Sequence, residues 1–332
     1  MEFIKKFFHK KLVTIGGGSG QYALLSGLRD AEQIDIAAVV SMADSGGSTG
    51  RLRDELGILP PGDVLKCILA LSPHRDMARS IFLKRFTGDR RLRGHNAGNM
   101  LLTMLSRYTG NFPSGIQALA EILDARGKIL PVTIDRATLV AELTDGSRIY
   151  GETAIDIPRG NQREKIRDVF LVPHHSDSIS VYPPVIDEIR SAHSIIIGPG
   201  DLFTSIIPSL IVPGVKEALQ KTRAQLLYVI NIMTKFGETH QFSGRDFVVK
   251  LEESIERKLD GIVYNTVKPD EDLLARYRDQ KAQFVQVDNS DGWWEERRLY
   301  AADLLETSGG IVRHHPGKLA EIIRSIVFES QG

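Results

Sequence analysis

The chain has 332 residues, of which 42% are hydrophobic and 25% charged, as is ordinary for a globular protein with a sizeable core. Its 42 basic residues equal its 42 acidic residues, so no overall field favours nucleic acid or a membrane surface as the partner. A single cysteine excludes an internal disulfide and no apolar run is long enough to span a bilayer, so we expect a cytoplasmic protein without a transmembrane segment.

Residues 1–11 lack the apolar stretch and cleavage site of a signal peptide, and we expect a short tail there. The apolar runs Leu12–Ile15 and Ile36–Val40 predict parallel strands covered on both faces, and residues 21–29 between them predict a helix, which completes a βαβ unit. Further helices are predicted over 63–71, 77–86, 98–109 and 113–123. Residues 61–127 are too many for a simple crossover, so we expect a helical insertion beside the sheet.

Residues 128–182 differ in character and predict a small antiparallel β subdomain. Its expected strands are 129–134, 138–143, 147–149 and 167–172, and Thr144–Ser147 forms a hairpin turn. Apolar strands follow at 194–197, 226–230, 261–264 and 284–287, and an amphipathic helix at 316–328 closes the chain. The sequence therefore predicts one Rossmann-like α/β domain over 1–332, with a mostly parallel sheet, helices on both faces, and a core formed by 11–60 and 183–330.

A glycine cluster follows the first strand directly: Gly16, Gly17, Gly18, Ser19 and Gly20. Glycines let the backbone approach a ligand closely, and the start of a helix offers unpaired N–H donors to an anion such as a phosphate. An ordinary dinucleotide fingerprint requires a third glycine where Gln21 stands, and an acidic residue after the second strand, where Ser41 stands. A P-loop would require Gly-Lys-Ser/Thr. Both familiar phosphate motifs are therefore disfavoured.

Four further polar segments offer candidate ligand-binding side chains. The second loop contains Asp44, Ser45, Gly46, Gly47 and Ser48; Asp44 could bind a hydroxyl, a base edge or Mg²⁺, or cap a helix. The other candidates are Asn96, Asn99, Gly198, Gly200, Asp201, Thr204, Ser205, Asn231 and Thr234. In an open parallel sheet, ligands sit beyond the carboxyl ends of the strands, so the segments after strands 12–15, 36–40, 194–197 and 226–230 should converge on one crevice.

The remaining polar and reactive residues carry weaker signals. The arginines Arg85, Arg90, Arg91 and Arg93 form either a solvated loop or a phosphate-facing one. Cys67 lies in an apolar helical pattern and is expected to be a buried, inert thiol. The pairs His174-His175 and His314-His315 lack metal-site spacing, and His74-Arg75-Asp76 lacks the companions of a kinase catalytic loop.

Taken in order, these loops resemble those of the CofD-like superfamily, whose named enzyme is a 2-phospho-L-lactate transferase. The likeness is closer to its YvcK-like branch, the gluconeogenesis factors of bacteria. The matching segments lie between residues 11 and 300: Ile15–Gly20, Ala43–Arg53, Gly94–Asn99, Gly198–Ile206 and Asn231–Thr239.

The resemblance implies a Rossmann-like core that binds a nucleotide, and in the YvcK-like branch a UDP-sugar such as UDP-N-acetylglucosamine. It also implies a cytoplasmic role in cell shape and wall synthesis during growth on gluconeogenic carbon sources, with cell-wall synthesis proteins as partners. The transferase branch has paired aspartates in its second loop, where this chain has Asp44-Ser45. This departure argues against transferase chemistry.

The leading hypothesis is therefore a nucleotide-sugar-binding regulator with no assigned catalytic residue. Residues 16–20 and 198–204 would hold the diphosphate, and Asn96 and Asn99 would close the pocket. Asp44, Ser45 and Asn231 would reach the sugar, ribose or base.

Two alternatives remain open. One is a Mg²⁺-dependent transferase that moves a phosphoryl-linked group from a nucleotide diphosphate, with Asp44 and Asp201 holding the metal. The other is a scaffold that acts through Trp293-Trp294 and the carboxyl-terminal helix. The sequence does not decide whether the chain forms a homo-oligomer.

Overall fold

The computed structural model describes residues 9–88, 92–160, 162–174, 177–290 and 292–329, and for residues 53–55 the backbone alone. Seven parallel strands form one sheet in the order β10-β9-β8-β7-β1-β2-β3. The strands are β1 (Lys10–Gly16), β2 (Ile34–Val40), β3 (Lys128–Pro131), β7 (Ser194–Ile197), β8 (Gln225–Val229), β9 (Gly261–Asn265) and β10 (Arg298–Ala302). β2 and β3 lie on one side of β1, and β7, β8, β9 and β10 follow one another on the other side. The strand order therefore reverses between β1 and β7.

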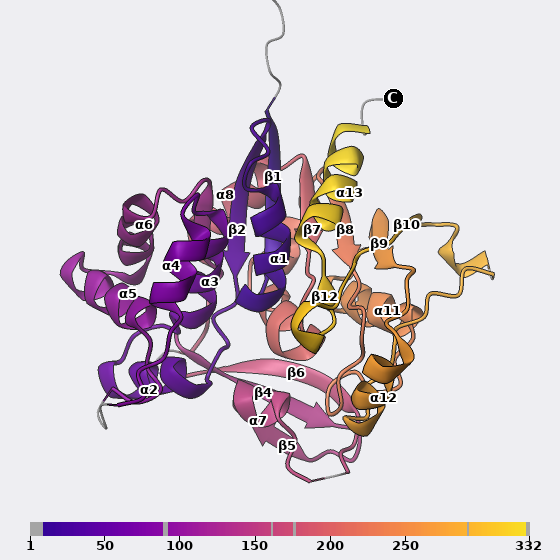
Figure 1. Cartoon of the computed structure of the whole chain (residues 1–332), viewed down its shortest axis with the longest axis horizontal. Helices are drawn as coiled ribbons and strands as arrows, with labels where there is room; N and C mark the ends of the chain where they lie inside the picture. Colours follow the sequence, from indigo (N-terminus) through magenta and orange to yellow (C-terminus); the bar gives the residue numbers. More distant parts are fainter. Residues whose placement is uncertain (1–8, 89–91, 161, 175–176, 291, 330–332) are drawn as a thin grey trace, which may run out of the picture.

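Helices cover both faces of this sheet, as expected (Figure 1). On one face α1 (Gly18–Leu28) packs between α3 (Gly62–Leu71) and α13 (Pro316–Glu329). On the other face α10 (Val215–Lys221) contacts both α8 (Pro183–Ser191) and α11 (Gly244–Ile255). The remaining helices are α2 (Gly47–Leu56), α4 (Arg75–Phe82), α5 (Ala97–Tyr108), α6 (Phe112–Ile122), α7 (Glu152–Asp156), α9 (Ile207–Leu210) and α12 (Glu271–Asp279); a π-helical turn, Leu202–Ile206, precedes α9, and short 3₁₀ turns cover Gly292–Trp294 and Ser308–Gly310.

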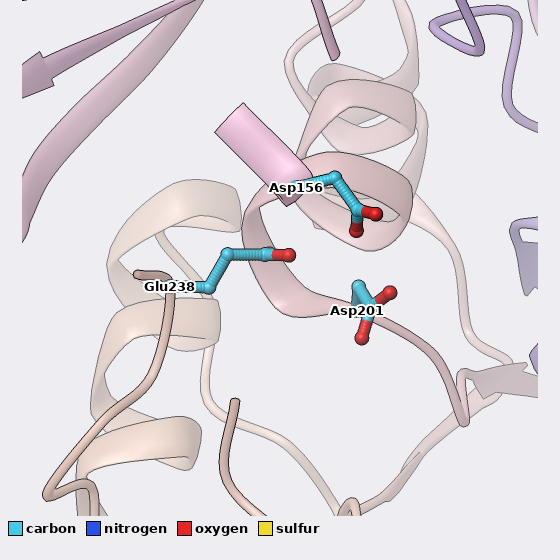
Figure 2. Close-up of side chains that lie close together, drawn as sticks. All are labelled: Asp156, Asp201 and Glu238. Atoms are coloured by element: carbon cyan, nitrogen blue, oxygen red, sulfur yellow. The ribbon is translucent and has the colours of Figure 1, made fainter. Parts of the chain in front are cut away.

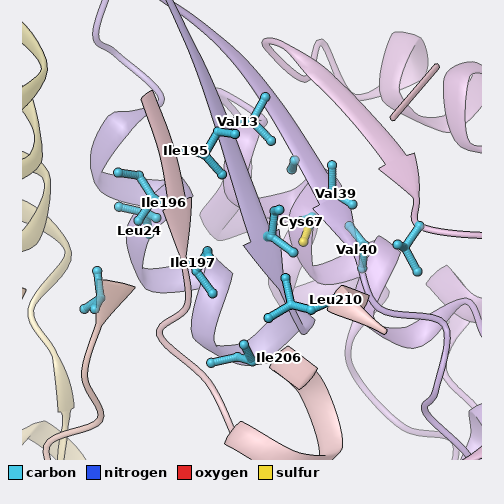
Figure 3. Close-up of a cluster of buried hydrophobic side chains, with 14 of the residues drawn as sticks. Val13, Leu24, Val39, Val40, Cys67, Ile195, Ile196, Ile197, Ile206 and Leu210 are labelled. Carbon is cyan, nitrogen blue, oxygen red and sulfur yellow. The ribbon is translucent and has the colours of Figure 1, made fainter. Parts of the chain in front are cut away.

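The hydrophobic core lies on both sides of the central strands (Figure 3). The three isoleucines 195–197 of β7 are fully buried, because alternate side chains of this strand enter opposite helical layers. Each such side chain stabilises the fold by about 1.5–3 kcal/mol relative to an exposed one. Cys67 lies in the same cluster, where burial raises the pKa of its thiol, so the expectation that this cysteine is buried is confirmed.

A second, antiparallel sheet with the order β5-β4-β6 lies below the main sheet in Figure 1. Its strands are β4 (Ala137–Leu143), β5 (Arg148–Tyr150) and β6 (Ile166–Pro173). The turn between β4 and β5 contains Gly146 in the left-handed region, with a φ of 83°. The predicted hairpin is therefore present. A smaller pair, β11 (Leu305–Glu306) with β12 (Arg313–His314), precedes α13.

Two predicted strands differ from the structure. The strand expected at 129–134 in the antiparallel subdomain is β3, which pairs in parallel with β2 at the edge of the main sheet. The strand expected at 284–287 is absent, since Phe284 forms only an isolated bridge with Met233. The outer strand is β10 instead, in which the apolar residues 299–302 follow Arg298 and every residue is exposed or half-buried.

The tail expected at 1–11 falls largely on residues 1–8, which lie outside the described residues, as do Arg90, Arg91 and His175. Within the described ranges no single helix is long and apolar enough to span a bilayer. The bent pair Leu202–Leu210 and Val215–Lys221, whose halves meet at 73°, reaches the necessary length and apolarity only together.

Candidate functional site

A cleft of about 970 Å³ opens at the carboxyl ends of the strands, where the strand order reverses. Loops after four strands contribute to its walls, as the topology requires. The sequence candidates that line it are Ser19, Gly20, Asp44, Gly200, Asp201, Thr204, Ser205, Asn231 and Thr234. The cleft is also lined by residues that the sequence did not single out: Asp63, Lys66, Glu152, Asp156, Lys235, Tyr277 and Arg313.

The glycine cluster makes room for neighbouring protein segments. A Cβ on Gly20 would lie 1.9 Å from the carbonyl oxygen of Pro199, and one on Gly18 would lie 2.5 Å from the Cα of Asp63. The cluster therefore packs directly against the loop after β7 and the start of α3. Among the described residues no side chain caps α1 at Gly17, and Ser19 and Gly20 of its first turn line the cleft, where the start of a helix favours an anion.

Gln21 explains why the dinucleotide fingerprint is incomplete. Its side chain is fully buried and donates from Nε2 to the carbonyl oxygens of Gly16 and Val39, at 2.9 and 3.0 Å. Its Oε1 accepts a hydrogen bond from the hydroxyl of Thr14. The amide thus ties the ends of β1 and β2 together and fills the space that a third glycine would leave.

The second loop contributes residues to two adjacent cavities. Asp44 is part of the cleft wall, and its carboxylate accepts a hydrogen bond from the N–H of Gly46 at 2.8 Å. Burial raises the pKa of Asp44, and the nearby Asp63 carboxylate raises it further. Ser45 and Gly47 line a neighbouring hollow of about 510 Å³ instead, which shares Glu152 with the cleft.

Asn96 and Asn99 are not among the residues that line the cleft. The side chain of Asn96 caps α5 by accepting from the N–H of Asn99 at 2.8 Å. Asn99 Nδ2 donates to the Ser48 hydroxyl at 3.3 Å, and that hydroxyl also bonds His95 Nδ1 at 2.9 Å. These residues hold α5 against the start of α2.

The loops after β7 and β8 are joined by polar contacts. The side chain of Asn231 accepts a hydrogen bond from the N–H of Gly200 at 3.2 Å. The loop after β7 is also joined to β1, because the N–H of Gly198 donates to the carbonyl of Ile15 at 2.9 Å. Thr204 donates its hydroxyl to the buried Glu238 at 3.2 Å. Thr234 bonds the backbone of Gln283 through both its N–H and its hydroxyl, at 2.7 and 2.9 Å.

Three carboxylates, those of Asp156, Asp201 and Glu238, point toward a common centre from three separate segments (Figure 2). Lys235 Nζ lies among them, 2.9 Å from Asp201 and 3.3 Å from Glu238, and it also pairs with Asp156. A divalent cation would suit these oxygen ligands but would have to displace the ammonium group. Lys235 already supplies the positive charge here.

Burial and neighbouring charges shift the pKa values of Glu238 and Lys235 in this cluster. Burial raises the pKa of Glu238 to about 8, with the Asp201 carboxylate acting in the same direction and Lys235 against it. Burial lowers the pKa of Lys235, but the three carboxylates raise it by more, so the ammonium form is retained.

Glu152 is the second titratable feature of the cleft. Burial, followed by the carboxylates of Asp44 and Asp156, raises its pKa to about 7. Its carboxylate accepts from the N–H of Ser45 at 3.3 Å, so the antiparallel sheet and the second loop meet at this residue. A carboxyl group that titrates near neutrality is suited to proton transfer.

The sequence pattern gave no signal for Glu152 and Asp156, because they follow a hairpin that lies outside the parallel core. Lys235 and Glu238 follow the predicted strand 226–230. Polar residues after the carboxyl end of a parallel strand are a sign of a ligand site, so this signal could have found them.

The comparison with known proteins decides the family. Residues 12–305 match the family described as 2-phospho-L-lactate transferase CofD. The chain belongs to the CofD family. Within this family it is 35% identical over 320 residues to the "Gluconeogenesis factor" of Bacillus subtilis, across 96% of this chain and 98% of that protein. A relative from Thermotoga maritima is 38% identical over 322 residues, or 95% of this chain and 99% of the relative.

A solved structure of this CofD-family type agrees with the fold described above. The crystal structure of protein BH3568 from Bacillus halodurans superposes with a TM-score of 0.88 at 34% sequence identity, covering 95% of this chain and 99% of that one. A second crystal structure of the same protein describes it as a member of the upf0052 family and gives a TM-score of 0.87.

Proposed function

We propose that the cleft binds a nucleotide sugar of the UDP-N-acetylglucosamine type and that the chain is a cytoplasmic regulator of wall synthesis and cell shape during gluconeogenic growth. The observation that carries the proposal is the uncapped start of α1 at a cleft of about 970 Å³. Such a helix start favours a diphosphate. The relatives named "Gluconeogenesis factor" support the physiological setting.

The charges in the cleft indicate how a diphosphate would be held. Lys66 is paired with Asp63 at 3.0 Å, and Lys235 is surrounded by carboxylates. Among the described residues Arg313 of β12 lines the cleft without an ion pair. We therefore assign Arg313 to the ligand, because a guanidinium suits a phosphate oxygen pair. The surplus of carboxylates favours a ligand that arrives with Mg²⁺ on the Asp44 side.

Calorimetric titration with UDP-N-acetylglucosamine and Mg²⁺ tests the proposal. We expect saturable binding that Arg313→Gln weakens by about tenfold or more, as expected for the loss of a charge-assisted hydrogen bond. Arg324→Gln, an exposed arginine of α13, serves as the matched control and should bind like the parent chain. No binding at millimolar ligand would overturn the proposal.

A second candidate function, the Mg²⁺-dependent transferase, is favoured by Glu152. An acceptor hydroxyl would attack the phosphorus of a nucleotide diphosphate donor, the nucleotide would leave with the electrons of the broken P–O bond, and Glu152 would take the hydroxyl proton. Asp44 and Asp201 would bind the metal. Release of nucleotide from the donor, abolished in Glu152→Gln, would favour this function; tight binding without turnover would favour the regulator.

A further inference from the structure

A second hollow, with a volume of about 600 Å³, adjoins the cleft across Phe236 and Ala282, which line both. We call it the Arg163 hollow, and its charged and aromatic lining consists of Arg163, Glu164, Phe236, His240, Arg278 and Lys281. Three cations and one histidine thus line the hollow with one carboxylate, and of these cations Arg278 is paired with Glu271 at 3.2 Å. This balance is opposite to that of the acid-rich cleft.

Arg163 has an unused binding edge. Its Nη1 donates to the carbonyl oxygens of Ala154 and Ile155, at 3.2 and 2.8 Å, and so is fully engaged. Its Nε and Nη2 are shielded from solvent and have no hydrogen-bond partner among the described residues. These two N–H groups form the side of the guanidinium that binds a carboxylate or phosphate through two parallel hydrogen bonds.

His240 repeats this pattern beside Arg163. Its Nδ1 is also buried without a hydrogen-bond partner among the described residues. The centre of its ring lies 5.6 Å from the centre of the Phe236 ring. Burial lowers the pKa of His240, and the positive charges of Lys165, Arg163 and Lys281 lower it further. Two cations of the hollow, Arg163 and Lys281, are therefore near enough to His240 to act on it together.

Lys281 occupies a backbone position that favours glycine. It follows α12 with a φ of 57°, and Ala282 N–H bonds the carbonyl of Tyr277 at 2.9 Å, as in a helix end closed by a left-handed residue. Its Nζ lies 4.7 Å from the centre of the Phe236 ring. The dipole at the end of α12 accounts for a cation here, but it does not account for the unpaired edge of Arg163.

We propose that the Arg163 hollow binds an oxyanion, the phosphate or carboxylate group of a small metabolite, independently of the ligand in the cleft. The oxyanion accepts from Nε and Nη2 of Arg163 and from His240 Nδ1, and it neutralises the charge of the hollow. Because Arg163 also holds the carbonyls of α7, an occupant lies next to the helix that carries Glu152 and Asp156.

The test is a titration of the full chain with inorganic phosphate, and separately with acetate, followed through the histidine ring resonances by NMR. The His240 signal is identified by its loss in His240→Gln. We expect it to move saturably with one of the two probes, which also distinguishes a phosphate from a carboxylate site. Failure of both probes to move it would overturn the proposal.

Variants then locate the binding. Arg163→Lys keeps a positive charge but not the two-donor edge, and should raise the dissociation constant by about tenfold or more. Arg163→Gln should do the same, while Arg324→Gln should leave it unchanged; circular dichroism checks that each variant is folded. Phosphate binding that Arg313→Gln weakens and Arg163→Lys leaves unchanged would place the anion in the cleft and overturn the proposal. Nucleotide-sugar binding in the cleft is measured separately, so the two proposals can fail independently.

Discussion

Gly20 lies against the carbonyl group of Pro199, so closely that a Cβ at Gly20 would come within 1.9 Å of that oxygen. The two loops at the reversal of strand order are thus in direct backbone contact. We expect Gly20→Ala to lower the free energy of unfolding by about 1–3 kcal/mol, because the loops must separate. Gly16→Ala is the matched control, since its Cβ would meet Gln21 Cγ at 3.4 Å, an ordinary contact distance. Urea unfolding measures both; equal stability of the two variants would refute the argument.

Lys235→Met tests the charge cluster of Figure 2. Removal of the ammonium leaves Asp156, Asp201 and Glu238 facing one another, so we expect a loss of about 1–3 kcal/mol of stability at pH 7, less than for a fully buried pair. Lys258→Met is the control, because Lys258 and Glu296 form a pair in which both side chains are about 60% exposed. That control should change stability by at most about 0.5 kcal/mol. A similar loss in both variants would show that Lys235 contributes no more than a surface pair.

Glu152 should make stability depend on pH in a defined window. Its pKa rises from 4.5 to about 7 on folding, so below pH 4.5 the group is protonated in both states and its contribution is fully present. Between these values the unfolded chain ionises first, and the contribution is lost as pH rises through 7.

Glu152→Gln cannot titrate, so we expect the parent chain to lose stability relative to this variant by about 1–3 kcal/mol from pH 4.5 to pH 8. Thermal unfolding across this range measures the difference. A constant difference between the two proteins would contradict the shifted pKa.

Asn96→Ala distinguishes a structural from a ligand-binding role. We expect it to cost about 1 kcal/mol, the usual value of a helix cap, and to leave nucleotide-sugar affinity unchanged. Asn111→Ala, which removes the corresponding cap of α6, should have the same effect on stability. A selective loss of ligand affinity in Asn96→Ala would show instead that Asn96 contributes to ligand binding.

The parallel core could be predicted from the sequence because β1, β2 and β7 are continuous apolar runs, a pattern that strands covered on both faces must have. The partner of β3 could not be predicted in this way, since a short apolar run does not specify which strand it will pair with. β10 was missed although residues 299–302 are apolar, because so short an apolar run does not by itself distinguish a strand.

The residues of the candidate site likewise divide into those that the sequence could predict and those that it could not. Asp44, Asp201 and Asn231 follow strands of the core, so strand direction alone brings them to one edge. Glu152 and Asp156 reach the cleft only because the antiparallel sheet folds back under it, and Arg313 arrives from β12 near the end of the chain. Contacts of this kind, between segments far apart in the chain, leave no periodic pattern in the sequence.

The buried amide of Gln21 also limits what this chain could become through single substitutions. A change to the dinucleotide fingerprint would require Gln21→Gly, which removes the acceptor of the buried Thr14 hydroxyl and two donors that join β1 to β2. An unpaired buried polar group costs about 1–3 kcal/mol, and the lost side chain leaves a void in addition. That first step would destabilise the protein before any new ligand could compensate, so nicotinamide-cofactor binding is separated from this sequence by a barrier in evolution as well as by a difference in motif.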